Sequence, residues 1–244
     1  SGKKGFYYNM NVQSLNKFYI PIIEKFDQLS SMGLAKSNGY ELDIIPKEMM
    51  YLNRIVNYDE DSIVENWSTW KYDKNNISQI ETWEDTLKND PRERPWFIGA
   101  LEKTNLDQVY WTEPYLYNTT FELGITASVS WTAEDFDSLT YVLAYDLTLN
   151  DISKFTESLK ATPNSMTFVL TEDEKFIGLP KNNLLKTDLQ KKETFLKSPS
   201  ESSIPVIGYA LEVWKEENNI DEPFHISFNN EDWWFYFKHF ELSK

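Results

Sequence analysis

The amino-acid sequence predicts an α+β fold in which one long helix precedes two stacked modules, each an antiparallel sheet flanked by helices. Apolar residues recur at helical spacing near the N-terminus, and β-rich runs separated by turn signals fill the middle of the chain. After residue 150 a shorter succession of helices and strands begins, although no sequence repeat is detectable. We therefore expect the long helix in residues 1–38, a first module in residues 39–150 and a second module in residues 151–244.

One apolar stripe defines the N-terminal helix. Its members are three or four positions apart, which places them on one helical face: Val12, Leu15, Tyr19, Ile22, Phe26 and Leu29. Pro21 lies inside the stripe and predicts a kink or a restart of the helix, whereas Gly33 and Asn38–Gly39 are stop signals. Because the stripe spans only about two heptads, packing on the protein's own core is favoured over a coiled-coil seam.

The middle of the chain is predicted to consist of strands joined by polar turns. Residues 40–90 contain the acidic cluster Asp59–Asp61, which lacks the Gly and the later Glu of a calcium loop and is interpreted as a solvated turn. Residues 109–111, 121–131 and 139–149 are three β-rich runs separated by turn-forming residues. These runs predict an antiparallel meander.

The second module is predicted to open with a short helix and to close with an aromatic hairpin. Asn150 or Asp151 caps the helix, which ends before Pro163. The further expected elements are strands at 166–170 and 176–179, a helix containing Ile207, Leu211 and Trp214, and a hairpin over 224–228 and 233–242. His225 and His239, on this hairpin, are interpreted as structural or surface residues.

Composition excludes several functional classes. The chain has 39 Asp and Glu against 24 Lys and Arg, a net charge of −15, so nucleic acids and anionic membrane surfaces are repelled. The absence of Cys excludes disulfides, thiol catalysis and thiolate metal sites, and it is compatible with an oxidising compartment. No phosphate-binding glycine loop, nucleophile elbow or paired metal-binding His motif occurs, so the sequence predicts neither a cofactor nor a metal site.

Six residues in three short segments form the candidate ligand site: Arg94, Trp96, Phe97, Tyr115, Tyr117 and Asp146. A guanidinium matches a carboxylate bidentately, and an ionised aspartate accepts hydrogen bonds from an ammonium group. The aromatic residues would supply apolar walls and two hydroxyl groups. Together these groups predict a site for a zwitterion, with free α-amino acids as the obvious candidates.

Simpler structural roles compete with this hypothesis. Arg94 could form a surface ion pair with Glu93 or Asp90, and Trp96 or Phe97 could be core residues. Asp146 precedes a predicted helix and could serve as its N-terminal cap.

The same segments resemble a known family. Arg-Pro-Trp-Phe at 94–97, Pro-Tyr at 114–115 and Asp-x-x-Leu at 146–149 are similar in order and spacing to double Cache sensor domains. The resemblance covers nearly the whole chain and implies two PAS-like modules, the membrane-distal one binding the ligand. In the amino-acid-binding class, the residues that stand as Arg94, Trp96, Phe97, Tyr115 and Asp146 contact the ligand. That class has a Tyr where Asn89 stands and often an acidic residue where Tyr117 stands. A small carboxylate, an amine or a modified amino acid is therefore an alternative ligand.

The expected function is therefore ligand sensing without catalysis. The resemblance implies the extracytoplasmic part of a bacterial receptor such as a chemoreceptor or sensor histidine kinase. We expect one transmembrane helix before residue 1, another after Lys244, and a weak homodimer through the N-terminal helix. The second module is expected to hold no comparable ligand site.

Two other functional classes are alternatives. A secreted carbohydrate-binding module would display exposed coplanar aromatic rings. A glycosidase-like enzyme would need two carboxylates facing each other across a cleft, and Glu134 with Asp135 is one acidic pair among many.

Overall fold

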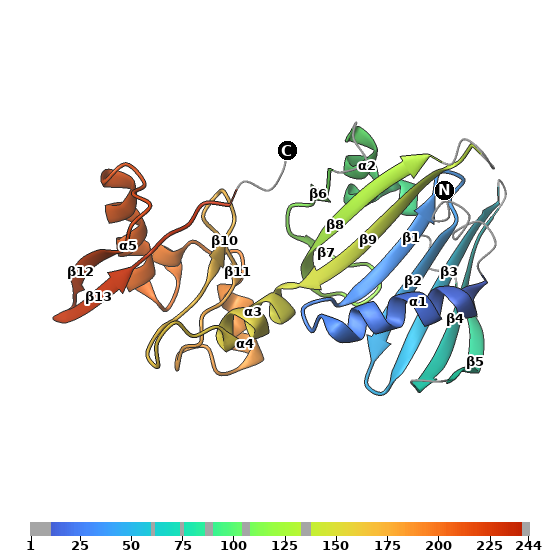
Figure 1. Ribbon diagram of the computed structural model, residues 1–244, viewed down its shortest axis with the longest axis horizontal. Helices are drawn as coiled ribbons and strands as arrows, with labels where there is room; N and C mark the ends of the chain where they lie inside the picture. The colour runs from blue at the N-terminus through green and yellow to red at the C-terminus, as the bar shows by residue number, and fades with distance from the viewer. Residues whose placement is uncertain are drawn as a thin grey trace. The chain divides into compact units, whose positions relative to one another are not determined.

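Figure 1 shows the computed structural model, which describes residues 11–59, 62–73, 76–85, 90–103, 108–132 and 138–240. Contacts within the chain divide the described residues into two compact units, the first ending at Asp151 and the second beginning at Ile152. Antiparallel strands and helices both contribute, so the predicted α+β class is confirmed. No helix in these ranges is both long and apolar enough to span a bilayer.

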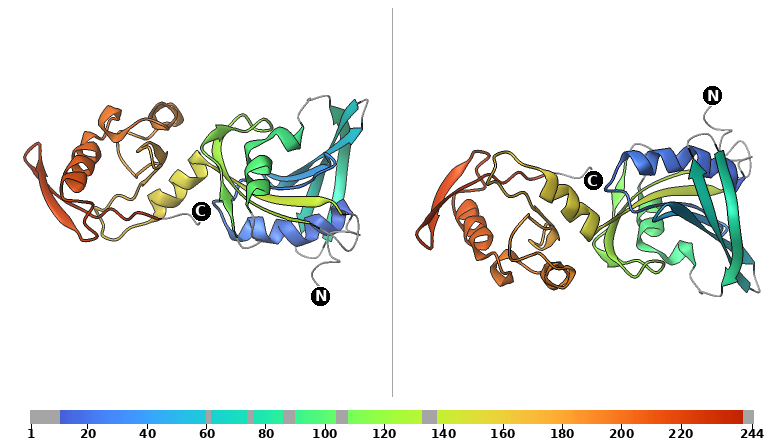
Figure 2. Two further views of the ribbon diagram at one scale, coloured as in Figure 1. Left: turned by 90° about the horizontal axis from the view of Figure 1, so that it is seen from above. Right: turned by 90° about the horizontal axis from the view of Figure 1, so that it is seen from below.

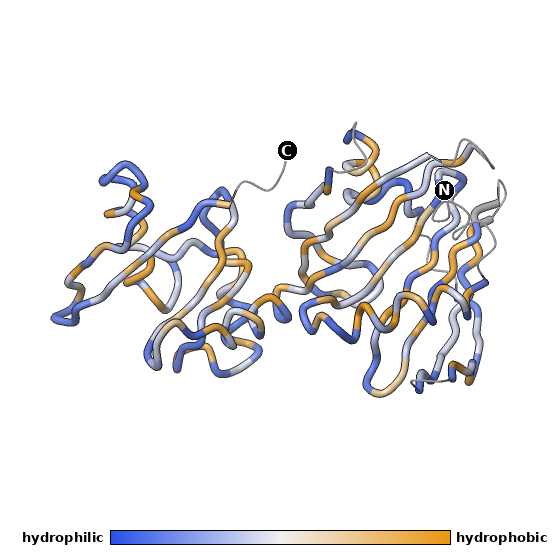
Figure 3. Tube along the Cα trace, in the orientation of Figure 1, coloured by the Kyte–Doolittle hydropathy of each residue, from blue (hydrophilic) through white to orange (hydrophobic). Residues whose placement is uncertain are grey.

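Helix α1, Val12–Lys25, is the amphipathic helix near the N-terminus. It begins where the Asn11 side chain accepts the Ser14 N–H at 2.9 Å. Figure 3 shows hydrophobic and hydrophilic residues alternating along it. Leu15 and Tyr19 of the stripe are buried in the core beneath the helix, so the stripe packs on the protein's own sheet.

The prediction of one long helix over residues 1–38 is wrong beyond Lys25. The chain leaves the helix at Phe26 and forms strand β1, Ser31–Lys36. This strand lies between β2 and β9 in the middle of the sheet, and its residues 31–35 are all buried. A strand covered on both faces has no polar alternation, so its apolar and small residues resemble the continuation of a helix. Residues 1–10 lie outside the described part of the chain.

Nine strands of the first unit form one antiparallel sheet in the order β5–β4–β3–β2–β1–β9–β8–β6, with β7 paired to β8. The other strands are β2 Glu41–Lys47, β3 Met50–Asp59, β4 Ser62–Asp73, β5 Asn76–Asp85, β6 Tyr110–Trp111, β7 Tyr115–Leu116, β8 Leu123–Thr132 and β9 Thr140–Thr148. The predicted meander over 109–149 corresponds to β6 to β9. The predicted turn at Asp59–Asp61 falls between β3 and β4, where residues 60–61 lie outside the described residues.

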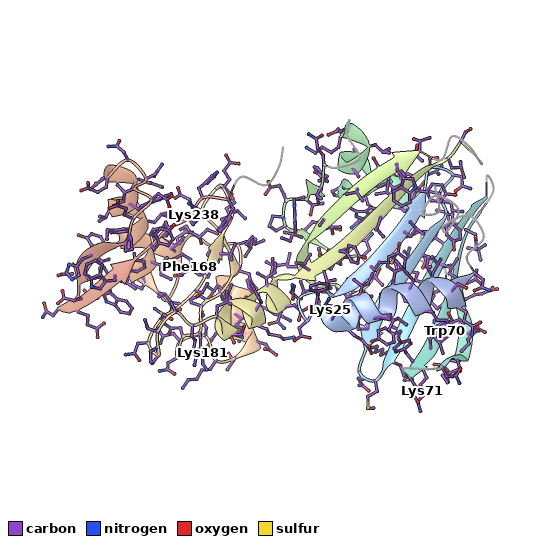
Figure 4. All side chains as sticks on the ribbon, in the orientation of Figure 1. Lys25, Trp70, Lys71, Phe168, Lys181 and Lys238 are labelled. Carbon is purple, nitrogen blue, oxygen red and sulfur yellow. The ribbon has the colours of Figure 1, made fainter. Side chains whose placement is uncertain are left out.

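The two faces of this sheet are covered by different helices. Figure 2 shows α1 on one face and α2, Pro95–Glu102, on the other. Side chains alternate between the faces along each strand. The α1 side carries an apolar core that includes Met32, Leu34, Leu42, Ile44 and Tyr141. Trp70 of β4 joins this core, whereas the next residue, Lys71, is exposed (Figure 4).

One fully buried polar pair lies within the contact between α1 and the sheet. Asn16 of α1 and Asn53 of β3 are fully buried and donate to each other's side-chain oxygens at 2.7 and 2.9 Å. Asn53 Nδ2 also lies 3.2 Å from the Asp43 carbonyl oxygen. The buried amides are therefore paired with each other.

The sheet face toward α2 is more polar and forms the floor of the candidate site. The strand registers place five residues in one row across five strands: Arg54, Asp43, Gly33, Ala144 and Ser128. Side chains two positions farther along each strand point to the same face, and they include charged and hydroxyl groups. Side chains from five strands thus converge under α2.

Helix α2 is an element that the sequence reasoning did not predict. It is only 8 residues long, and a proline occupies its first turn, where proline is tolerated. Ser128 Oγ and Ser130 Oγ of β8 donate to the carbonyl oxygens of Trp96 and Ala100, both at 2.8 Å. These bonds hold α2 against the sheet.

The second unit contains short elements around aromatic side chains. Their bounds are α3 Leu149–Ser158, β10 Val169–Leu170, β11 Phe176–Gly178, α4 Asp188–Thr194, α5 Pro205–Glu216, β12 Phe224–Phe228 and β13 Glu231–Phe235. Instead of the one predicted sheet, the described residues form two separate two-stranded sheets, β10–β11 and β12–β13. The rings of Phe168 (Figure 4), Trp214 and Phe235 lie 5.2–5.9 Å from that of Phe237, so ring packing supports these short strands.

One predicted detail of the second unit is wrong, and one of its helices was not predicted. The cap of α3 is Thr148, whose Oγ1 accepts the Asp151 N–H at 3.1 Å, and not Asn150 or Asp151. Helix α4, which lies in the polar stretch before α5, was not predicted. A reciprocal capping box between Thr187 and Gln190 marks the start of this helix, a pattern that is visible in the sequence.

Candidate functional site

Five of the six predicted site residues line one cavity of the first unit: Arg94, Trp96, Tyr115, Tyr117 and Asp146. The cavity is small, with a volume of about 40 Å³. Its other lining residues are Gly33, Glu41, Asp43, Arg54, Asn118, Thr119 and Ala144. Phe97 is not among the lining residues, and Asn89 lies outside the described residues.

Arg94 is positioned by the start of α2. It has extended backbone angles as the residue before the helix, and its guanidinium carbon lies 5.4 Å from the centre of the Tyr115 ring. Its Nη2 lies 3.4 Å from the Leu116 carbonyl oxygen. Asp90 pairs instead with Arg92, whose Nη2 donates to it at 2.6 Å. An ion pair between Arg94 and Asp90 therefore does not explain Arg94.

Asp146 lies on β9 at the polar face of the sheet. Ser31 Oγ and Thr126 Oγ1 each donate to its carboxylate at 2.6 Å, and Tyr115 Oη lies 2.7 Å from Thr126 Oγ1. Burial raises the pKa of the Asp146 carboxyl to about 6, although the two hydroxyl groups favour the ionised form. Because Thr148 caps α3, the capping role does not explain Asp146 either.

The two tyrosine hydroxyl groups are used within the protein. Tyr117 Oη donates to the Ile125 carbonyl oxygen at 2.6 Å and accepts the Leu147 N–H at 3.1 Å. The Tyr115 hydroxyl bonds to Thr126. Their rings are perpendicular, with centroids 5.1 Å apart. The rings therefore wall the cavity as expected, while the hydroxyl groups hold the strands together instead of pointing to a ligand.

Trp96 and Phe97 have different environments. Trp96 lines the cavity and also belongs to a small core with Ala100, Val142 and Ala144, whereas Phe97, which is 2% exposed, belongs to this core without lining the cavity. Successive residues of a helix point about 100° apart, so Trp96 reaches the cavity from the edge of this core while Phe97 does not. The alternative core role holds for Phe97.

A buried charge network that the sequence reasoning missed forms part of the cavity wall. Arg54 is 2% exposed, and its Nη1 donates to Glu41 Oε2 at 2.5 Å and to Asp43 Oδ2 at 3.0 Å. Its Nη2 donates to Glu65 Oε1 at 2.7 Å. Glu41, Asp43 and Arg54 all line the cavity. One guanidinium thus faces three carboxylates.

The charge network changes the electrostatics of the site. Burial, together with the charge of Asp43, raises the pKa of Glu41 to about 8, and burial also raises the pKa of Asp43. The sequence does contain a sign of this network. Glu41 and Asp43 alternate along an otherwise apolar strand, and a single Arg54 lies in the neighbouring strand. Charged residues on the inward face of a strand are costly unless they have a purpose or a partner.

A second and larger cavity adjoins the first. Its volume is about 310 Å³, and it shares Asp43, Tyr117, Thr119 and Asp146 with the smaller cavity. A volume in this range is typical of small-molecule sites. The smaller cavity can hold only the charged end of a ligand, so the rest of a ligand would occupy the larger one.

The fold is that of double Cache sensor domains, the ligand-binding domains of bacterial chemoreceptors, which confirms the resemblance noted in the sequence. The chain is similar to the ligand-binding domain of the Campylobacter jejuni chemoreceptor Tlp3 in complex with 4-methylisoleucine, with a TM-score of 0.51 and 19% sequence identity. The match covers 91% of this chain and 64% of that chain. The Tlp3 domain with L-norvaline gives TM-score 0.52, 17% identity, and coverage of 91% and 63%. The chain thus spans less than two thirds of these domains.

Sequence comparison gives one further relative. A segment of 93 residues, 38% of this chain, is 32% identical to the methyl-accepting chemotaxis protein McpC of Bacillus subtilis (strain 168) and covers 14% of it. No protein-family model matches the chain.

Proposed function

We propose that the chain is an extracytoplasmic sensor domain of a bacterial membrane receptor and that its first unit binds a small zwitterion of the α-amino acid class. The observation that carries the proposal is the placement of Arg94 and the half-buried Asp146 on one cavity, with aromatic rings between them. The Tlp3 domains of the same fold bind amino acids, and McpC is a chemotaxis receptor, which supports the same reading.

The chemistry of binding follows from the two charged residues. Arg94 presents a planar set of donors that suits the ligand's carboxylate, and the Tyr115 ring beneath it limits its rotation. Asp146 is held in place by Ser31 and Thr126 and can accept from the ligand's ammonium group. An ammonium group near Asp146 would lower the pKa of this carboxyl and favour its ionised form.

The geometry favours binding over catalysis and over sugar recognition. Glu41 and Asp43 bond to Arg54 instead of flanking an open cleft, and Glu134 with Asp135 lies outside the described residues. Trp96 and Tyr117 are each 6% exposed and so cannot serve as an open platform for a sugar ring. We infer a ligand-sensing role without an enzymatic step.

The experiment is calorimetric titration of the protein with a panel of α-amino acids, small carboxylates and amines. Arg94→Gln should weaken binding of any amino acid that binds by about 30-fold or more, since losing one partner of a desolvated charge pair costs ~2–5 kcal/mol. Arg92→Gln is the matched control, because Arg92 pairs with Asp90 and does not line the cavity. Equal affinities in the wild type and Arg94→Gln would place the site elsewhere.

The remaining parts of the receptor are also proposals. Anchoring in a membrane would come from segments beyond the sequence given, and ligand affinity that differs between two conformations would drive signalling. Phe18 on α1 and Phe26 just after it are 43% and 42% exposed and offer a surface for a weak homodimer. Sedimentation over a concentration series should find mostly monomer at micromolar concentration, and a tight, salt-independent dimer would contradict this expectation.

A further inference from the structure

Gly33 lies in the floor of the smaller cavity. It belongs to β1 and is paired with Asp43 of β2 and Ala144 of β9 in the strand registers, and all three residues line the cavity. Position 33 is in the interior of a buried central strand, where glycine weakens a sheet because it has no side chain to pack. Its φ lies outside the left-handed region, so the backbone would accept any L-residue. Backbone conformation therefore does not explain this glycine.

The other glycines within described helices and strands have their side-chain space filled by the protein. A Cβ atom at Gly99 or Gly124 would lie 2.1 or 2.3 Å from an atom of a tyrosine side chain. A Cβ atom at Gly178 or Gly208 would meet three neighbouring atoms at 3.2 Å or less. At each of these four positions, a neighbouring group occupies the place of the side chain, so close packing explains the glycine.

A Cβ atom at position 33 would meet far fewer atoms. Within the described part of the chain, its neighbours inside 4 Å are Asp43 Oδ1 at 3.0 Å and the Ala144 Cβ atom at 3.9 Å. Both belong to side chains that line the smaller cavity, so a side chain at position 33 would project into the same space. The room left by Gly33 is thus open to the cavity. A glycine in a strand often marks a place where a ligand approaches the backbone closely.

The groups around this room suit a small head with several hydrogen-bond donors. Asp43 Oδ2 accepts from Arg54 at 3.0 Å, whereas Asp43 Oδ1 is the atom that faces the room over Gly33. Asp146 of β9, on the other side of β1, lines the same cavity. A primary ammonium group has three donors and can reach carboxylates on both sides. Because the cavity has a volume of only about 40 Å³, a methyl group on the nitrogen or at position 33 would compete for this room.

We propose that Gly33 is a specificity-determining residue of the amino-acid site. The ligand's ammonium group lies directly over the main chain of β1 at Gly33, and the room left by the missing side chain holds a primary ammonium group but not an N-methylated one. This inference rests on the proposed function, since it assumes that Asp146 receives the ammonium group and Arg94 the carboxylate. Gly33 then serves ligand binding, although alanine would stabilise the strand better.

The variant Gly33→Ala tests this proposal by titration calorimetry with L-alanine, L-valine and L-leucine. The affinity of each ligand that binds the wild type should fall at least about tenfold, because one methylene group in a fitted pocket is worth about 10- to 200-fold. The midpoint of urea unfolding should equal or exceed that of the wild type, since alanine restricts the unfolded chain more than glycine does. Val64→Ile is the matched control, because it adds one methylene group at an exposed position of β4 outside both cavities and should leave the affinity unchanged.

A comparison of ligands tests the same point on the wild type, so the proposal does not depend on the folding of a variant. We expect L-alanine, L-valine and L-leucine to bind at least about tenfold tighter than their N-methyl derivatives. The side chain and the charge are the same in each pair, so the difference reports the surroundings of the nitrogen. Ala144→Gly removes the neighbouring methyl group of the cavity floor and should reduce the preference to about threefold or less.

The outcomes separate this inference from the proposed function. If amino acids bind Gly33→Ala as tightly as the wild type, or if the wild type binds the N-methyl derivatives equally well, the role of Gly33 is wrong while the amino-acid site stands. A lower urea midpoint for Gly33→Ala would assign the glycine to packing against Asp43 and would also overturn the inference. A preference for primary amines that is unchanged in Ala144→Gly would overturn it too, because hydrogen bonding instead of room would then select the ligand. If no amino acid binds the wild type, the proposed function fails, and the present inference fails with it.

Discussion

The substitution Asp146→Asn should raise the stability of the ligand-free protein while it removes ligand binding. The pKa of Asp146 is raised from its ordinary value of 3.8 to about 6, so the ionised carboxylate destabilises the fold above pH 6. At ~1.4 kcal/mol per pKa unit, this destabilisation is about 3 kcal/mol. The amide keeps the size of the side chain, and the weaker bonds to Ser31 and Thr126 offset about 1 kcal/mol. The net gain at pH 8 is then about 2 kcal/mol.

Linkage gives the sign of the pH dependence. Because the folded-state pKa of Asp146 lies above the unfolded value, the contribution of its protonated form to stability is fully present below about pH 3.8 and is lost as the pH rises through about 6. The advantage of Asp146→Asn should therefore grow between pH 5 and pH 8.

Thermal and urea unfolding of both proteins at these two pH values measure this difference. At ~2–4 °C per kcal/mol, we expect a gain in melting temperature of about 6 °C at pH 8. Calorimetry on the same samples should show that binding is lost. A variant that is destabilised equally at both pH values would refute the argument, because Asp146 would then be an ordinary structural residue.

Two further predictions concern the same cavity. For the wild type, amino-acid affinity should fall about tenfold per pH unit below pH 6, because the ligand's ammonium group needs an ionised Asp146. Calorimetry at pH 4.5, 5.5 and 7 measures this dependence. The variant Glu41→Gln removes the titration of Glu41 near pH 8, so that the remaining pH dependence reports Asp146. A constant affinity would exclude Asp146 as the acceptor. Tyr117→Phe should cost about 1–3 kcal/mol in unfolding free energy, because the Leu147 N–H and the Ile125 carbonyl oxygen lose their partner, while the cavity wall and the ligand affinity are retained. Unchanged stability in urea unfolding, or a large loss of affinity, would show that the hydroxyl group serves the ligand.

Much of the fold was predictable because its signals are periodic and local. The stripe through Leu15 and Tyr19 predicted α1, and the apolar runs before Leu149 predicted the strands of the meander. Strand β1 was not predicted because burial on both faces removes the alternation that identifies a strand. Helix α2 is too short, and too apolar on all sides, for a helical period to appear.

The residues of the candidate site were likewise predictable only where a local motif marks them. Arg94, Trp96 and Asp146 were predicted because motif order brought them together, even though the distances between them depend on the whole sheet. Glu41 and Arg54 were missed because their proximity arises from the registers of β2 and β3, which a single sequence does not reveal. Phe97 was placed in the site because the Arg-Pro-Trp-Phe motif has an aromatic residue there, but helix geometry turns its side chain into the core.

The reciprocal amide pair between Asn16 and Asn53 has a mechanical consequence. An apolar contact alone would let a helix slide by one turn over the sheet at the modest cost of repacking side chains. A slide of this kind would break both hydrogen bonds between two buried amides, at a cost of about 1–3 kcal/mol for each polar group left unpaired. The amide pair therefore favours one position of helix α1 on β3, so a displacement of β3 should carry the helix with it.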